Sequence, residues 1–287
     1  MTTEYSPMSD RRGILLETGE HRTWFKWHRG HRFAQDLSFT RERIAEAMKL
    51  GASVEIDLVR FDGDGFAVLH DETLDQATTG TGPVLKASAD YLRGLNLRDK
   101  AGAPTAHPVM LIDDLGALLA GTERNGDAVL QLDLKEASSS IRDSDIAAFA
   151  EAIAPVSRAV ILSGGDAEAA ERLSRALPDM PIGYDPCHDG AMERLMESRD
   201  FAGFVEGVIE ASPRAEMIYV HHGLVLFADD AGYDLVAAFH RADRRVDAYT
   251  INTAVPAVLP AVRRLLELKV DQITTDDPVG LEALLSA

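Results

Sequence analysis

The chain has 287 residues, of which 46% are hydrophobic and 26% charged, and its formal net charge is −18. The composition is ordinary for a globular protein, and the length suits either two domains or one large barrel. The acidic balance argues against nucleic acid and anionic membranes as partners, because their negative charge would be repelled, although local cations could still bind a small phosphorylated substrate.

From about Trp24 onward, short apolar segments alternate with longer amphipathic segments rich in alanine. The short segments are predicted as strands at 24–27, 53–59, 128–134, 160–163, 182–184, 217–220, 246–251 and 272–274. The amphipathic segments are predicted as helices at 39–50, 108–120, 145–153, 167–177, 191–197, 233–242 and 255–268, with one further unit at 204–209. Helices interleaved with strands predict a parallel α/β sheet.

Two further features complete the predicted fold. The turn signal Asp62-Gly63-Asp64-Gly65 joins the strand at 53–59 to a short segment at 66–70, which predicts a β-hairpin. Because no linker or change of composition divides the chain, we predict a single (β/α)8 TIM barrel over residues 24–287, with a small β-hairpin insertion after the second strand. Residues 1–23 are predicted to form an N-terminal arm or a cap over the bottom of the barrel.

Two carboxylates, Glu55 and Asp57, stand two residues apart in the predicted strand at 53–59. Side chains alternate along a strand, so both point to one face, where adjacent buried carboxylates would repel each other. A hard divalent cation with oxygen ligands resolves this conflict, and a solvated strand face is the structural alternative. His28 and Asp133 also fall at the carboxyl ends of predicted strands, where (β/α)8 barrels place their active sites.

The polar motifs of the chain occur in a specific order. They are His28-Arg29-Gly30, Glu55-Ile56-Asp57, Asp64-Gly65, His70-Asp71, Thr78-Thr79-Gly80-Thr81-Gly82, Asp133-Leu134-Lys135, Tyr249-Thr250-Ile251-Asn252 and Thr275-Asp276-Asp277-Pro278. Each motif alone is weak. Together, in this order and spacing, they resemble the glycerophosphodiester phosphodiesterase family of the phosphatidylinositol-phosphodiesterase-like TIM barrel superfamily, from about residue 24 to the end.

The resemblance implies a role for each matching residue. The ligands of one divalent metal ion, Mg²⁺ or Ca²⁺ with Mn²⁺ as a further candidate, would be Glu55, Asp57 and Asp133. The catalytic acid and base would be His28 and His70, and the phosphate would be bound by Arg29 and Lys135. Further candidates for the pocket are His31, Tyr249 and His222. Taken singly, Asp133 could also be a structural carboxylate and Lys135 a surface lysine.

The resemblance implies a phosphoric diester hydrolase that uses the metal and both histidines to cleave a small glycerophosphodiester into an alcohol and glycerol 3-phosphate. Three departures from the family pattern leave alternatives open. Leu37-Ser38-Phe39-Thr40 replaces Pro-Glu-Asn-Thr, Asp133 replaces the usual Glu, and Gln76 replaces an Arg. The alternatives are another small diester, such as a sugar phosphodiester, and a non-catalytic phosphate-ligand binder on the same scaffold.

The remaining expectations concern the surroundings of the protein. Cys187 is the only cysteine, so an internal disulfide cannot form, and no apolar run reaches the length of a signal-peptide core or a membrane helix. We therefore expect a cytoplasmic protein, and the resemblance implies a role in lipid and glycerol metabolism. Its partner would be a small-molecule phosphodiester, without nucleic acid or membrane insertion, and a homo-oligomer stays open.

Overall fold

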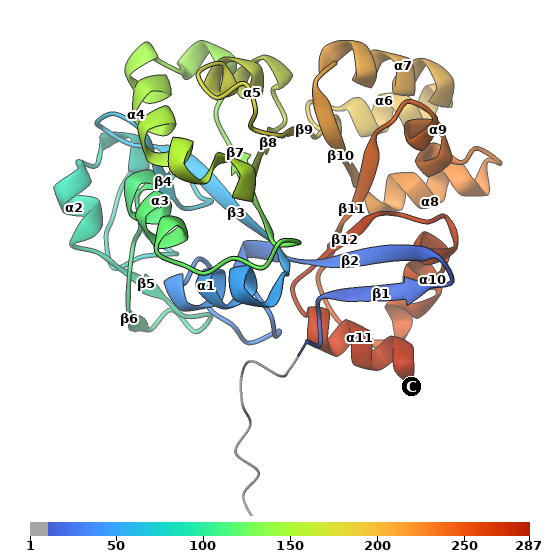
Figure 1. Ribbon diagram of the computed structural model, residues 1–287, viewed down its shortest axis with the longest axis horizontal. Coiled ribbons are helices and arrows are strands. Elements are labelled where there is room, and N and C mark those ends of the chain that lie inside the picture. Colours follow the sequence, from blue (N-terminus) through green and yellow to red (C-terminus); the bar gives the residue numbers. More distant parts are fainter. Residues whose placement is uncertain (1–10) are drawn as a thin grey trace, which may run out of the picture.

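The computed structural model describes residues 11–287. Within them, eight parallel strands form a closed barrel (Figure 1). Around the barrel they are β2 (His21–Trp27), β3 (Ser53–Arg60), β7 (Val129–Leu134), β8 (Val160–Gly164), β9 (Ile182–Tyr184), β10 (Ala215–His221), β11 (Arg245–Ile251) and β12 (Gln272–Thr275). Pairing of β12 with β2, and of β2 with β3, closes the ring. The predicted (β/α)8 TIM barrel is confirmed.

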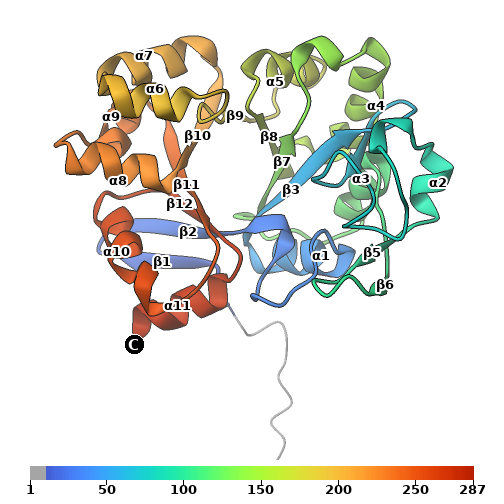
Figure 2. The ribbon, with the colours of Figure 1, turned by 180° about the vertical axis from the view of Figure 1, so that it is seen from behind.

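Helices surround the barrel on its outside. They are α1 (Arg41–Leu50), α3 (Ile112–Ala120), α4 (Asp143–Ile153), α5 (Ala167–Ser174), α6 (Ala191–Ser198), α7 (Phe201–Ala211), α8 (His222–Asp230), α9 (Leu235–Arg241), α10 (Leu259–Glu267) and α11 (Pro278–Ser286). Seen from behind, α1 to α5 cover one half of the barrel and α6 to α11 the other (Figure 2). No helix in residues 11–287 combines the length and the apolar character that crossing a bilayer requires.

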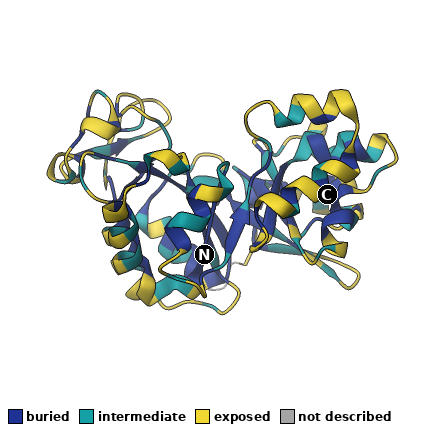
Figure 3. Cartoon of the chain, turned by 90° about the horizontal axis from the view of Figure 1, so that it is seen from above, coloured by how far each residue is buried: buried dark blue, intermediate teal, exposed yellow. Residues whose placement is uncertain are grey.

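Strand β3 illustrates how the sequence builds this barrel. Its residues from Ser53 to Val59 are all buried, as expected for a strand with helices on one face and the barrel interior on the other. Val54, Ile56 and Leu58 belong to a large apolar cluster under the helices. Glu55 and Asp57 alternate with them and therefore face the interior. In Figure 3 the strands are buried, while exposed residues lie mainly on the helices and loops.

The N-terminal segment adds a strand outside the ring. Within the predicted arm, β1 (Leu15–Thr18) pairs antiparallel with the first part of β2. The last two residues of β2, Lys26 and Trp27, pair with β3 instead. The Trp27 indole donates a hydrogen bond to the Gly13 carbonyl at 2.7 Å. The barrel strand begins at His21, three residues before the predicted start at Trp24. The part of the predicted arm in residues 1–10 lies outside the described residues.

The predicted hairpin after the second barrel strand is present, and the segment beyond it holds further structure. Strand β4 (Phe66–Val68) pairs antiparallel with β3. It is followed by α2 (Ala89–Arg93) and by a separate hairpin of β5 (Asn96–Arg98) and β6 (Pro104–Pro108), none of which was predicted. The helix predicted from residue 108 begins at Ile112, because Pro108 ends a strand.

Candidate active site

The register of the parallel strands gathers the predicted acids. Asp57 on β3 lies opposite Asp133 on β7, and Asp133 lies opposite Ser163 on β8. Glu55 is two residues before Asp57 and therefore shares its face. Oxygen atoms of Glu55, Asp57 and Asp133 all lie within 4.8 Å of one another. The three acids form one cluster inside the barrel, near the carboxyl ends of the strands.

Burial makes this cluster energetically costly without a counter-charge. Burial and the nearby Asp133 raise the pKa of Glu55. Burial, followed by the charge of Glu55, raises the pKa of Asp57 to about 7. Burial acts in the same direction on Asp133, but the charge and hydrogen bond of Lys135 outweigh it and lower its pKa. One oxygen of Asp57, Oδ2, is buried and accepts no hydrogen bond from the described residues, although Arg29 Nε lies 3.3 Å from it as an ion-pair partner. A buried carboxylate cluster with an unsatisfied oxygen fits a divalent cation that prefers oxygen ligands.

Two cations border the acids. Lys135 Nζ lies 2.8 Å from Asp57 Oδ1 and 2.5 Å from Asp133 Oδ2. Arg29 donates its backbone N–H to Glu55 Oε2 at 2.9 Å, and its side-chain Nε lies 3.3 Å from Asp57 Oδ2. Arg29 adopts a left-handed backbone conformation, with φ of 52°, in the turn after β2. This turn aims both its amide and its guanidinium at the acids.

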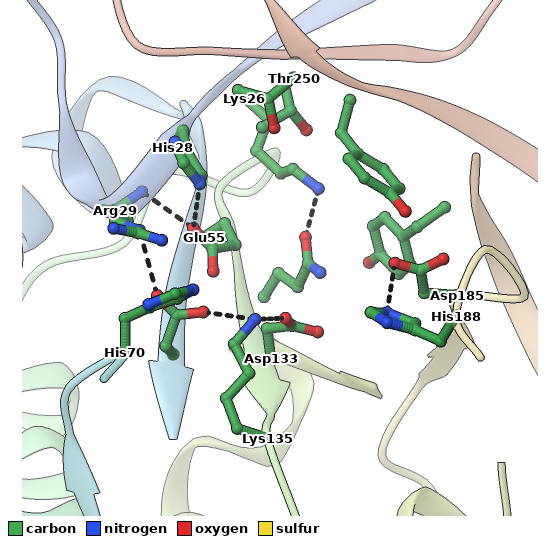
Figure 4. A pocket seen from close by; sticks show the side chains of 15 residues that line it. Lys26, His28, Arg29, Glu55, His70, Asp133, Lys135, Asp185, His188 and Thr250 are labelled. Atoms are coloured by element: carbon green, nitrogen blue, oxygen red, sulfur yellow. Dashed lines mark hydrogen bonds and ion pairs between the residues drawn. The ribbon is translucent and has the colours of Figure 1, made fainter. Parts of the chain in front are cut away.

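Two histidines flank the same cluster, and each is oriented by a carboxylate. His28 Nδ1 lies 2.7 Å from Asp276 Oδ1, and His70 Nδ1 lies 2.8 Å from Asp71 Oδ1. Because an ionised carboxylate only accepts hydrogen bonds, each Nδ1 carries the proton and Nε2 is left to take up or release one. His28 Nε2 is 3.9 Å from Glu55 Oε2. Figure 4 shows both imidazoles on the side of the pocket occupied by Arg29.

The three residues predicted as pocket candidates lie in different places. Tyr249 lines the cavity. His31 is buried, with its Nδ1 3.2 Å from Asp276 Oδ1 and its Nε2 2.9 Å from Ser38 Oγ. The His31 ring therefore supports the carboxylate that also orients His28. His222 begins α8, and its Nδ1 lies 3.0 Å from the Tyr249 carbonyl oxygen. Neither His31 nor His222 lines the cavity.

The cavity itself has a volume of about 170 Å³ and contains residues that the motifs did not identify. Its lining side chains, all of which carry polar atoms, are Lys26, His28, Arg29, Glu55, Asp57, His70, Gln131, Asp133, Lys135, Asp185, His188, Tyr219, Tyr249, Thr250 and Thr274. Asp185 directly follows β9, so its place at the carboxyl end of a barrel strand was available as a signal. Lys26 stands two residues before His28 and shares its face.

A chain of hydrogen bonds connects the buried Lys26 to the acid cluster. Lys26 Nζ donates to Gln131 Oε1 and lies 3.0 Å from Asp247 Oδ2. Gln131 Nε2 donates to Ser163 Oγ at 2.8 Å, and Ser163 Oγ donates to Asp133 Oδ1 at 2.9 Å. Lysine has only donors and a carboxylate only acceptors, so the direction of every bond in this chain is fixed. The chain therefore holds Asp133 in one orientation.

The fold and site define a (β/α)8 barrel hydrolase with an acidic cluster flanked by histidines. The family model described as the glycerophosphoryl diester phosphodiesterase family matches residues 28–279. The chain belongs to this family and is an enzyme of the phosphodiesterase class. Among curated proteins, no match to the chain is found.

Solved structures of similar fold carry related descriptions. A glycerophosphoryl diester phosphodiesterase from Parabacteroides distasonis is 18% identical, with 98% of this chain and 92% of that chain covered and a TM-score of 0.65. A glycerophosphodiester phosphodiesterase from Agrobacterium tumefaciens is 21% identical, with 92% and 100% covered and a TM-score of 0.62. A phosphodiesterase from Oleispira antarctica, in complex with the product sn-glycerol-3-phosphate, is 18% identical, with 92% and 96% covered and a TM-score of 0.64.

Proposed function

We propose that the protein hydrolyses a small glycerophosphodiester to an alcohol and glycerol 3-phosphate, with a divalent cation held by Glu55, Asp57 and Asp133. The observation that carries the proposal is the convergence of three acids whose oxygens lie within 4.8 Å of one another, beside two histidines that carboxylates orient. The family match and the glycerol 3-phosphate bound by the relative from Oleispira antarctica support this substrate class.

The residues divide the work of cleaving a phosphorus–oxygen bond. The cation, when bound, neutralises charge on the phosphate and polarises its oxygens. Arg29 and Lys135 contact the same acids and bind the non-bridging phosphate oxygens. One of His28 and His70 accepts, through Nε2, a proton from the water whose oxygen forms the new bond to phosphorus. The other donates a proton to the departing alkoxide, which is otherwise a poor leaving group.

A sugar phosphodiester is the second candidate substrate, and one feature favours it. A groove of about 350 Å³ adjoins the cavity and shares Arg29 and His70 with it. Its walls include Leu37, Ser38 and Phe39, which replace the usual family motif, together with Gln76. Two of the three departures from the family pattern, at residues 37–39 and at Gln76, therefore meet in one groove, where they would contact the alcohol half of the substrate.

The test measures release of the alcohol from glycerophosphocholine, glycerophosphoethanolamine and a glycerol–phosphate–sugar diester by the purified protein. We expect turnover that a chelator abolishes and that Mg²⁺, Ca²⁺ or Mn²⁺ restores. Activity that survives exhaustive chelation would contradict the metal role. Binding of diesters without turnover by the metal-loaded protein would favour a non-catalytic binder. Faster turnover of the sugar diester than of the other two would favour the second candidate.

A further inference from the structure

A second group of polar residues lies across the cavity from the predicted catalytic histidines. Asp185 follows β9 and is 9% exposed. His188 Nε2 donates to Asp185 Oδ2 at 3.0 Å, and the Tyr249 side chain lines the same cavity. Figure 4 shows Asp185 and His188 on one side of the pocket and His28, Arg29 and His70 on the other. None of the three residues has a part in the proposed chemistry at phosphorus.

The surrounding backbone holds this group in place. The Cys187 amide donates to Asp185 Oδ1 at 2.8 Å, and the Asp185 amide donates to the Gly164 carbonyl at 3.1 Å. The imidazole of His188 lies against Gly165, where an added Cβ would be only 2.4 Å from His188 Cδ2. A side chain at this glycine would displace the ring. The imidazole is therefore positioned from both sides, by a carboxylate and by a glycine.

The positioned imidazole offers a free hydrogen-bonding atom to the cavity. Nε2 is engaged by Asp185, and none of the described residues binds Nδ1 of His188. The hydrogen bond with Asp185 raises the pKa of His188. Nδ1 can accept a hydrogen bond from a hydroxyl group when it is unprotonated and donate one to its oxygen when it is protonated.

The chemistry of the walls selects among possible ligands. Every side chain that lines the cavity carries a polar atom, so an acyl chain placed there would leave polar groups of the wall without hydrogen-bond partners. A quaternary ammonium group prefers a cage of aromatic faces, whereas this side presents a carboxylate that is already hydrogen-bonded to an imidazole. Hydroxyl groups can both donate and accept, which matches a wall of imidazole, carboxylate and phenol.

We propose that Asp185, His188 and Tyr249 form a subsite for the hydroxyl groups of a polyol carried by the phosphate, which in the proposed function is the glyceryl group. This assignment rests on the proposed function for the identity of the substrate. The glyceryl group then lies on the Asp185 side and the phosphate at the acid cluster. The other alcohol esterified to the phosphate lies toward the groove that shares Arg29 and His70 with the cavity.

The test compares two ligands that differ only in hydroxyl groups. Glycerol 3-phosphate and n-propyl phosphate have the same length, and calorimetric titration of the Mg²⁺-loaded protein gives a Kd for each. We expect the wild-type protein to bind glycerol 3-phosphate about tenfold more tightly, as one or two well-placed hydrogen bonds allow. His188→Ala and Asp185→Asn should each bring this ratio close to one while the Kd of n-propyl phosphate stays unchanged. His188→Gln, which keeps an amide donor, should restore part of the ratio.

A matched control is available elsewhere in the chain. His240 Nε2 contacts Asp271 Oδ2 at 2.8 Å, a similar pair that does not line the cavity, so His240→Gln should leave the ratio at its wild-type value. A wild-type ratio near one, or variants that keep the full ratio, would overturn the subsite. Equal weakening of both ligands would also overturn it, because it would indicate general damage. Failure of diester turnover alone, with the ratio intact, would refute the proposed function and leave the subsite standing.

Discussion

The raised pKa of Asp57 predicts that the metal-free protein loses stability as the pH rises through neutrality. The pKa of this carboxyl is raised from its ordinary value of 3.8 to about 7 in the fold. The folded protein therefore binds a proton that the unfolded chain has released between these values, so stability falls as pH increases and levels off above about pH 7. At 1.36 kcal/mol per pKa unit, the loss between pH 5 and 7.5 is roughly 2 to 3 kcal/mol.

The assay is urea unfolding of the chelated protein at several pH values, with Asp57→Asn as the reference. The variant carries no titrating group at this position, so the difference between its pH dependence and that of the wild type reports Asp57 together with its interaction with Glu55. Other groups, such as His188, contribute to both proteins and cancel. Mg²⁺ should reverse the loss in the wild type, because a bound cation stabilises the ionised carboxylate and only the folded state forms the site.

Two results would refute this reasoning. Wild-type stability that is flat, or that rises relative to Asp57→Asn between pH 5 and 7.5, would mean that the carboxyl is already compensated in the fold. An identical Mg²⁺ effect on the two proteins at pH 7.5 would mean that Asp57 does not contact the cation.

Three further substitutions test the site. His28→Ala and His70→Ala should each lower kcat by roughly a hundredfold or more, as loss of a proton-transfer group does, with little change in Mg²⁺ affinity measured by titration. Glu55→Gln should weaken Mg²⁺ binding itself, and unchanged binding would remove this residue from the ligand set. Gln131→Leu should weaken Mg²⁺ binding roughly tenfold, because it breaks the hydrogen-bond chain that orients Asp133. Gln272→Leu is its control, since this buried glutamine donates to Ser53 instead, and equal effects of the two changes would contradict the orienting role.

The barrel was predictable because short apolar segments and amphipathic helices differ in length and period. Strand β9 is predicted with its observed bounds, Ile182–Tyr184, and the other barrel strands differ by a few residues at their ends. Helix α8 was missed because it begins at His222, directly after β10 ends at His221, without a turn signal between them. The segment from α2 to β6 was missed because its strands are only three and five residues long and contain few apolar residues, so the sequence carries no clear period.

The acid cluster was predictable for a different reason. Alternation places Glu55 and Asp57 on one face, and parallel strands deliver Asp133 to the same layer. The buried Lys26 could not be recognised in this way, because its partner Asp247 lies on a strand far along the chain and only the closed ring brings the two together. Adjacency to the His-Arg-Gly motif suggested a pocket role for His31, but the turn after β2 directs its ring to Asp276 instead.

The surroundings of Cys187 make the sole thiol of the chain chemically quiet. Burial, followed by the charge of Asp185, raises the pKa of this thiol to about 12, so its reactive thiolate is scarce at neutral pH. A second cysteine introduced at an exposed position, such as the turn between β5 and β6, would therefore react selectively with a fluorescent maleimide. The hairpin of β5 and β6 can thus be labelled and followed by spectroscopy in the native sequence, without first replacing Cys187.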